Sequence, residues 1–291
     1  MPDDTKRIAV TGAGGNLGSK LITAFESSTW CHSIVAIDHA LPDRGFPGTS
    51  KVKAVQADLT DRRDRRWIAA IDQADVIIHL AAQNPYPTAS WDDSTASFDM
   101  TLNLLGAAGT AALSRFVFIS SNHVMGGYKD AVPAVGPGML TEALAPRPGT
   151  RTVDANGKVS DSPAYAVHKL MGERLCRERA FGSGRRLTTV SLRVGWCQPG
   201  ENLPSTLNAT GVPGESVPDS NVEAARAYRW FRGMWLSNGD LVRIVERACL
   251  ADASSWSSPA IVINAMSANE DMVWSLENAC RYLGYTPRDG S

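Results

Sequence analysis

"RIAVTGAGGNLGSKL", residues 7–21, joins a short apolar run to a helical pattern through a turn rich in glycine. Gly12, Gly15 and Gly18 follow one another at intervals of three, with Gly14 between the first two. A backbone without Cβ atoms turns tightly, and the free N–H groups at the start of the following helix attract anions. The stretch therefore predicts a strand, a phosphate-binding turn and a helix, the opening unit of a dinucleotide-binding fold.

The same alternation continues along most of the chain. Further apolar runs lie at residues 33–38, 51–56, 75–82, 115–121, 186–195 and 260–265, and helical patterns lie at 16–28, 97–114, 162–180, 239–252 and 269–285. Strands that are apolar almost throughout and separated by helices are typical of a parallel sheet covered on both faces. We expect an α/β fold with a doubly wound parallel sheet (a Rossmann fold). Residues 1–195 would form the nucleotide-binding domain with the catalytic residues, and 196–291 a small C-terminal substrate-binding lobe that completes the sheet.

Composition narrows the class of protein. The 291 residues carry a net charge of −1, which gives no reason to expect nucleic acid or a membrane as partner. The first residues lack the pattern of a signal peptide, and no apolar run is long enough to span a bilayer. Five scattered cysteines suit reduced thiols in the cytoplasm and indicate no metal site.

Asp38 closes the second apolar run, 20 residues after Gly18. An acid at this place binds the ribose hydroxyls of the cofactor and repels a 2′-phosphate, so NAD is favoured over NADP. Arg44 follows within reach and keeps NADP open. Asp58 and Leu59 follow the third run, where the carboxylate either lies near the adenine or caps a helix.

Tyr165 and Lys169 are four residues apart in a helical pattern and share one face. A nearby ammonium stabilises a phenolate and lowers the pKa of the tyrosine, which suits general acid–base chemistry. A hydroxyl from Ser121, at the end of the fifth run, would hold the reacting oxygen. These three residues are the predicted catalytic set.

Taken together, "TGAGGNLG" (11–18), Asp38, "DL" (58–59), "HLAA" (79–82), "NLLG" (103–106), "SS" (120–121) and "YAVHK" (165–169) give the chain its family resemblance. It resembles the extended short-chain dehydrogenase/reductase superfamily, and within it the NAD-dependent epimerase/dehydratase family. The resemblance implies hydride transfer with a nicotinamide and assigns to Asn103 the support of its helix and of Lys169. It also implies a set of cofactor-binding residues: Gly12, Gly14, Gly15, Asn16, Leu17, Gly18, Asp38, Asp58, Leu59, Leu80, Ala81, Ala82, Asn103, Tyr165, Lys169 and Val194.

The run "SSNHVMGGY" (120–128) resembles uronate dehydrogenases, NAD enzymes that oxidise C1 of a hexuronate to an aldarolactone. That likeness implies that Asn122 and His123 contact sugar hydroxyls, beside Ser121 and Tyr165. Asn84 stands where a substrate-binding serine is expected.

A substrate carboxylate calls for a guanidinium that binds it in two places. Residues 224–242 offer Arg226, Arg229 and Arg232, and 227–242 match the arginine region of uronate dehydrogenases if one residue is inserted, which favours Arg229, with Arg232 second. The alternative is an amphipathic helix with a solvated basic face.

The sequence thus predicts NAD-dependent oxidation of the anomeric carbon of an anionic aldose, a hexuronate or a sugar 6-phosphate or 6-sulfonate such as sulfoquinovose, to its lactone. The alternatives are a sugar-nucleotide epimerase or reductase and a non-catalytic dinucleotide sensor. Homo-oligomerisation through the helices around 95–112 and 163–180 is what the superfamily implies.

Overall fold

A seven-stranded parallel sheet forms the centre of the molecule. The computed structural model describes residues 5–43, 45–46, 50–83, 89–108, 113–153, 158–212, 214 and 222–291. Along the chain the strands are β1 (Lys6–Thr11), β2 (Cys31–Asp38), β3 (Val52–Gln56), β4 (Val76–His79), β5 (Arg115–Ser121), β8 (Thr188–Val194) and β9 (Ala260–Ala265). Their order in the sheet is β3-β2-β1-β4-β5-β8-β9, and every neighbouring pair is parallel. The predicted doubly wound fold is confirmed.

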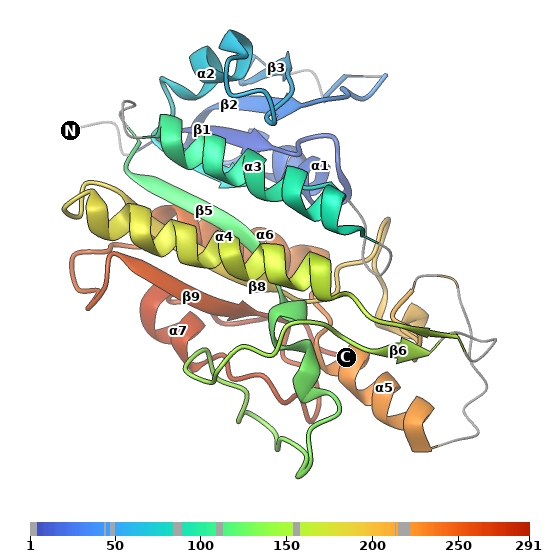
Figure 1. Cartoon of the computed structure of the whole chain (residues 1–291). Coiled ribbons are helices and arrows are strands. Elements are labelled where there is room, and N and C mark those ends of the chain that lie inside the picture. Colours follow the sequence, from blue (N-terminus) through green and yellow to red (C-terminus); the bar gives the residue numbers. More distant parts are fainter. Residues whose placement is uncertain are drawn as a thin grey trace.

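Helices cover both faces of this sheet (Figure 1). On one face α1 (Asn16–Glu26), α6 (Asn238–Leu250) and α7 (Glu277–Leu283) share a core that includes Leu21 and Leu241. On the other face α2 (Arg65–Ile71), α3 (Trp91–Ala107) and α4 (Pro163–Gly182) share a core that includes Trp67 and Leu104. Apolar strands with two buried faces produce this arrangement, because each face needs its own layer of helices.

A third core lies beyond the carboxyl ends of β5 and β8. Val124, Leu140, Phe231 and Trp274 are buried in it. The short elements around it are η1 (Asn122–Tyr128), the hairpin strands β6 (Thr152–Val153) and β7 (Val159–Ser160), η2 (Pro204–Thr206) and α5 (Val222–Gly233). Residues 196–291 thus supply both α5 of this region and β9 of the main sheet, while the predicted boundary at 195 stays a prediction.

The predicted helix over 269–285 is wrong in its first half, since α7 begins only at Glu277. The preceding backbone pairs with another segment: the N–H groups of Gly138 and Leu140 donate to the carbonyls of Met272 and Val273, at 3.0 and 2.8 Å. Carbonyls engaged in this way cannot accept the bonds of a helix, so a long-range contact overrides the local pattern.

The strand order reverses between β1 and β4, which are neighbours in the sheet although β2 and β3 separate them in the chain. In open α/β sheets such a switch point opens a crevice at the carboxyl ends of the strands. Gly12 follows β1 and Leu80 follows β4, so the glycine-rich turn lies at this crevice. None of the described helices is long and apolar enough to cross a membrane.

Candidate active site

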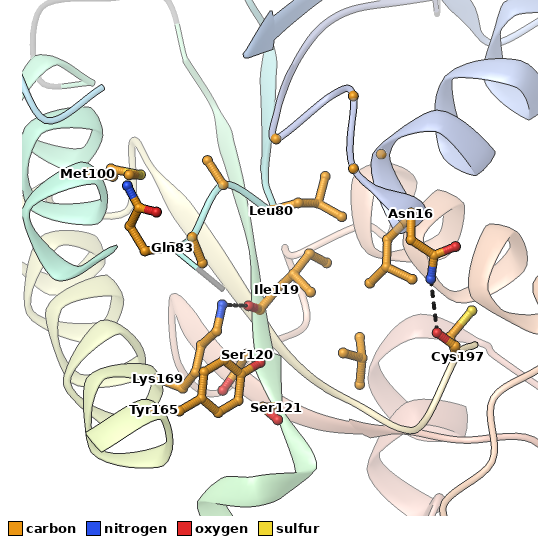
Figure 2. A pocket seen from close by; sticks show the side chains of 18 of the residues that line it. Asn16, Leu80, Gln83, Met100, Ile119, Ser120, Ser121, Tyr165, Lys169 and Cys197 are labelled. Atoms are coloured by element: carbon orange, nitrogen blue, oxygen red, sulfur yellow. Dashed lines mark hydrogen bonds between the residues drawn. The ribbon is translucent and has the colours of Figure 1, made fainter. Parts of the chain in front are cut away.

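One cavity of about 840 Å³ runs along this edge of the sheet, from the glycine-rich turn to the ends of β5 and β8 (Figure 2). Every residue predicted to bind the cofactor lines it except Asn103, and so do Ser121, Asn122 and His123. Other lining residues were not predicted: His39, Ala40, Ala57, Thr60, Gln83, Met100, Ile119, Ser120, Gly195, Trp196, Cys197, Pro199, Gly211 and Met234.

Two glycines at the turn between β1 and α1 leave no room for a Cβ atom. Gly12 has a φ of +68°, and a Cβ there would lie 2.7 Å from the backbone nitrogen of Ala81. At Gly18 a Cβ would lie 2.2 Å from the carbonyl oxygen of Gly12. Helix α1 begins at Asn16, and its N-cap residue makes no side-chain capping bond. The first N–H groups of the helix therefore face the cavity without a built-in partner, an arrangement that fits a pyrophosphate.

Asp38 lies beside this turn, as predicted. Its Oδ2 accepts the backbone N–H of Gly14 at 2.9 Å, and its Oδ1 pairs with Nδ1 of His39 at 2.9 Å. The carboxylate is thereby fixed at the end of β2, within the wall of the cavity. Arg44 lies outside the described residues.

Two predicted cofactor residues shape the neighbouring wall. Asp58 lines the cavity while its Oδ1 accepts the N–H and the hydroxyl of Thr60, at 2.8 and 2.7 Å, so it closes a turn and does not cap a helix. Asn103 donates to the carbonyls of Leu59 and Thr60, at 2.9 and 3.1 Å. It therefore holds α3 against this wall, while its predicted support of Lys169 stays a prediction.

The buried imidazole of His79 supports the glycine-rich turn after β1. Nδ1 of His79 lies 2.7 Å from the hydroxyl of Thr11, and Nε2 lies 2.9 Å from the hydroxyl of Thr101. The hydroxyl of Thr11 also accepts the N–H of Ala81 at 3.3 Å. Burial keeps the pKa of His79 well below its usual value, so the ring is neutral and acts as a hydrogen-bonding spacer between β1, β4 and α3.

Ser121, Tyr165 and Lys169 meet at the opposite end of the cavity (Figure 2). Nζ of Lys169 donates to the backbone carbonyl of Ile119 at 2.8 Å. The side chains of Tyr165 and Ser121 line the same end of the cavity. Three groups from α4 and β5 are thus brought together, as the sequence predicts.

Their protonation differs from the prediction in one respect. Burial raises the pKa of Tyr165 more than the neighbouring Ser121 hydroxyl lowers it, so the net direction is opposite to the predicted lowering. Burial also lowers the pKa of Lys169 to about 8. With the ammonium bonded to Ile119 and itself costly to keep charged, the site without ligands favours a neutral phenol.

Asn122 and His123 form the wall next to the catalytic serine. Nδ2 of Asn122 donates to the carbonyl of Val194 at 3.0 Å, whereas its buried Oδ1 has no hydrogen-bond partner in the described part of the chain. Nδ1 of His123 lies 2.7 Å from the hydroxyl of Thr150, and its ring meets that of Tyr165 edge-on. Burial lowers the pKa of His123 to about 3, so this imidazole is neutral.

The predicted anion-binding residues lie elsewhere. Arg229 is exposed on α5, and Arg232 pairs with Glu270 at 3.3 Å. Neither residue belongs to the cavity wall. The prediction failed because a sequence match with one inserted residue does not fix which face of α5 turns inward. Asn84 lies outside the described residues.

A buried polar cluster behind the catalytic residues was not predicted from the sequence. The hydroxyl of Ser120 donates to Oε1 of Glu173 at 2.7 Å, and Glu173 also binds Arg193 of β8. An arginine inside the apolar run "TTVSLRVG" (188–195) was the available signal, because a buried charge needs a partner.

Comparisons with known proteins identify the family of the chain. The family model described as "NAD dependent epimerase/dehydratase family" matches residues 8–195. The chain is 34% identical to an L-arabinose 1-dehydrogenase (NAD(P)(+)) of Haloferax volcanii, over 98% of this chain and 97% of that protein. It is 27% identical to an NAD-dependent glucose-6-phosphate dehydrogenase of the same organism, over 98% and 94%.

Among solved structures, a uronate dehydrogenase from Agrobacterium tumefaciens superposes with a TM-score of 0.65. It is 24% identical, and the match covers 99% of this chain and 86% of that one. A likeness at this identity supports the fold.

Proposed function

The chain belongs to the NAD-dependent epimerase/dehydratase family, and from this premise we propose that it is an NAD-dependent sugar 1-dehydrogenase that converts an aldose to its lactone. Two relatives of nearly full length bear the names of sugar dehydrogenases. The sugar class is left open at this level: the acidic substrate predicted from the sequence depends on arginines that do not line the cavity.

One observation carries the proposal. The hydroxyls of Ser121 and Tyr165 and the ammonium of Lys169 lie in the same cavity as the glycine-rich turn and Asp38. A dinucleotide that places its pyrophosphate on α1 and its adenosine ribose at Asp38 extends along this cavity toward Tyr165. Lys169 would then hold the nicotinamide ribose.

Residues of the chain would orient the C1 oxygen of the sugar and accept the proton of its hydroxyl. Ser121 donates to the oxygen on C1 of the sugar and fixes its orientation. Tyr165, as phenolate, takes the proton of the C1 hydroxyl, while the hydrogen on C1 leaves with its electron pair. Bound NAD⁺ supplies the acceptor for that hydride. The C1–O bond becomes a carbonyl, which within the sugar ring is a lactone.

Tyr165 must lose its proton for this step, although burial alone raises its pKa. Positive charge brought near the phenol stabilises the phenolate. Lys169 supplies that charge only while it is protonated, and its pKa of about 8 places this requirement close to neutrality. The reaction therefore requires Tyr165 to be deprotonated while Lys169 is still protonated, and a change in pH favours one of these states at the expense of the other.

The test is NADH formation, followed by absorbance, on a panel of aldoses that includes L-arabinose, D-galactose, D-glucose, D-galacturonate and glucose 6-phosphate. We expect turnover of at least one sugar with a lactone product, and loss of turnover in Tyr165→Phe. Tightly retained NAD without net NADH would point to an epimerase instead. No turnover on any aldose would refute the proposal.

A further inference from the structure

The cavity wall around the catalytic residues is made of neutral groups. Asn122, the neutral imidazole of His123, the half-buried ring of Trp196, Met234 and Gly211 all line it. Amide and imidazole groups exchange hydrogen bonds with hydroxyls, and an aromatic face packs against the apolar side of a sugar ring. This wall is suited to a polyol without charge.

The arginines of α5 do not line the cavity. Arg226 pairs with Asp130 at 3.1 Å and Arg232 with Glu270 at 3.3 Å. Arg229 is exposed. Asp130 also forms ion pairs with Lys129 and Arg151, at 3.1 and 3.4 Å. The positive charges near Arg226 are therefore already paired with a carboxylate of the protein.

Lys169 is the one lysine or arginine among the cavity-lining residues that the structure describes. Its Nζ is bonded to the carbonyl of Ile119, and its assigned partner is the cofactor ribose. Of the residues outside the described part of the chain, only Arg44 is a lysine or arginine, and in the sequence it follows Asp38 by six positions. A carboxylate or phosphate at C6 of the sugar would thus lose its hydration on entering the cavity and would find no lysine or arginine there to pair with, apart from Lys169.

We propose that the substrate is an uncharged aldose, and that the enzyme discriminates against uronates and sugar phosphates. The inference rests on the proposed sugar 1-dehydrogenase function and specifies its substrate class. Its physical basis is that an anion taken from water into a wall of neutral groups loses hydration that these groups do not replace.

Asn122 adds an argument for a polyol. Its Nδ2 is committed to Val194, and the buried Oδ1 is an acceptor without a donor among the described residues. A ring hydroxyl of the sugar can donate to this amide oxygen. Neutral and acidic sugars share such hydroxyls, so the discrimination against an anion rests on the missing cation.

Three sugars provide a matched test. L-Arabinose, D-galactose and D-galacturonate have the same ring configuration and differ only in the substituent on C5, which is hydrogen, hydroxymethyl or carboxylate. We expect kcat/KM for the better of the two neutral sugars to exceed that for D-galacturonate by about tenfold or more. Calorimetric binding to NAD-loaded Tyr165→Phe, which needs no turnover, should give the same ranking. A higher kcat/KM or tighter binding for D-galacturonate would overturn this inference and leave the proposed function intact.

The α5 arginines provide the control. Arg229→Ala and Arg232→Ala should each leave the ratio of galactose to galacturonate kcat/KM within about twofold of the unaltered enzyme. A selective tenfold loss for galacturonate in either variant would show that this arginine holds the carboxylate and would overturn the inference. Failure of every sugar to be oxidised or bound would refute the proposed function itself.

Discussion

Glu173 binds Arg193 through two hydrogen bonds, from Nε to Oε1 at 2.9 Å and from the second guanidinium nitrogen to Oε2 at 2.8 Å. Both side chains are 3% exposed. Glu173 lies one helical turn after Lys169 on α4, and Arg193 lies on β8. The pair therefore fixes the helix that carries Tyr165 and Lys169 against the sheet that carries Ser121.

Replacing Arg193 alone should be strongly destabilising. Arg193→Met leaves a buried carboxylate without its cation, which costs about 3–5 kcal/mol. The double variant Glu173→Met/Arg193→Met removes both charges and should recover most of that loss. Chemical denaturation of the three proteins measures the difference. A single variant as stable as the unaltered protein would contradict the role given to this pair.

Lys169 should cost stability at neutral pH. Burial lowers its pKa from 10.5 to about 8, so between these values the unfolded chain holds a proton that the folded protein has lost. The free energy of unfolding therefore rises with pH between 8 and 10.5. Below pH 8 the buried Lys169 is charged, and its full destabilising effect is present.

Lys169→Met removes that cost. The variant should be more stable than the unaltered protein at pH 7 by roughly 2 kcal/mol, after allowing about 1 kcal/mol for the lost bond to Ile119. The advantage should shrink as the pH rises toward 10.5, while turnover is lost at every pH. Unfolding curves at pH 7 and 10 provide the measurement, and an advantage that grows with pH would refute the assignment.

The glycine-rich turn should tolerate no added methyl group. In Gly18→Ala the new Cβ would lie 2.2 and 2.8 Å from the carbonyl oxygens of Gly12 and Ala13, so the backbone must shift. We expect the Kd for NADH to rise by about tenfold or more. Gly106→Ala is the control, because nothing lies within 4 Å of its Cβ position on α3. This variant should bind NADH normally and gain up to about 1 kcal/mol of stability.

Asp38 should decide between the two cofactors. Asp38→Ser removes the charge that repels a 2′-phosphate and keeps an oxygen near the N–H of Gly14. The ratio of kcat/KM for NADP to that for NAD should rise by about tenfold or more. Initial rates with both cofactors measure this ratio. An unchanged ratio would show that Asp38 does not discriminate between a 2′-hydroxyl and a 2′-phosphate on the adenosine ribose.

The outer surfaces of α3 and α4 should form a contact between two copies of the chain. The helices lie side by side (Figure 1), and Leu102 and Met171 are 45% and 44% exposed. Leu102→Glu and Met171→Glu should shift a dimer to monomer in light scattering. Leu250→Glu, at a 37% exposed position on α6, is the matched control and should leave the mass unchanged. A monomeric unaltered protein would refute the contact.

The sequence allowed the sheet and the catalytic end of the cavity to be predicted, because both depend on local patterns. The strands are apolar runs, and Tyr165 and Lys169 share a helical face whatever surrounds them. What failed depended on distant partners: Arg232 pairs with Glu270 outside the cavity, and residues 138–140 hold 272–273 out of a helix.

The core shared by α1, α6 and α7 has a consequence for folding. It joins Ile8 and Val10 of β1 to Leu283 and Tyr285, which lie far away in the sequence. Asn16 also donates to the carbonyl of Cys197 across 181 positions of the chain. Packing this face of the sheet therefore requires segments far apart in the sequence to meet, and contacts of such long sequence separation slow folding.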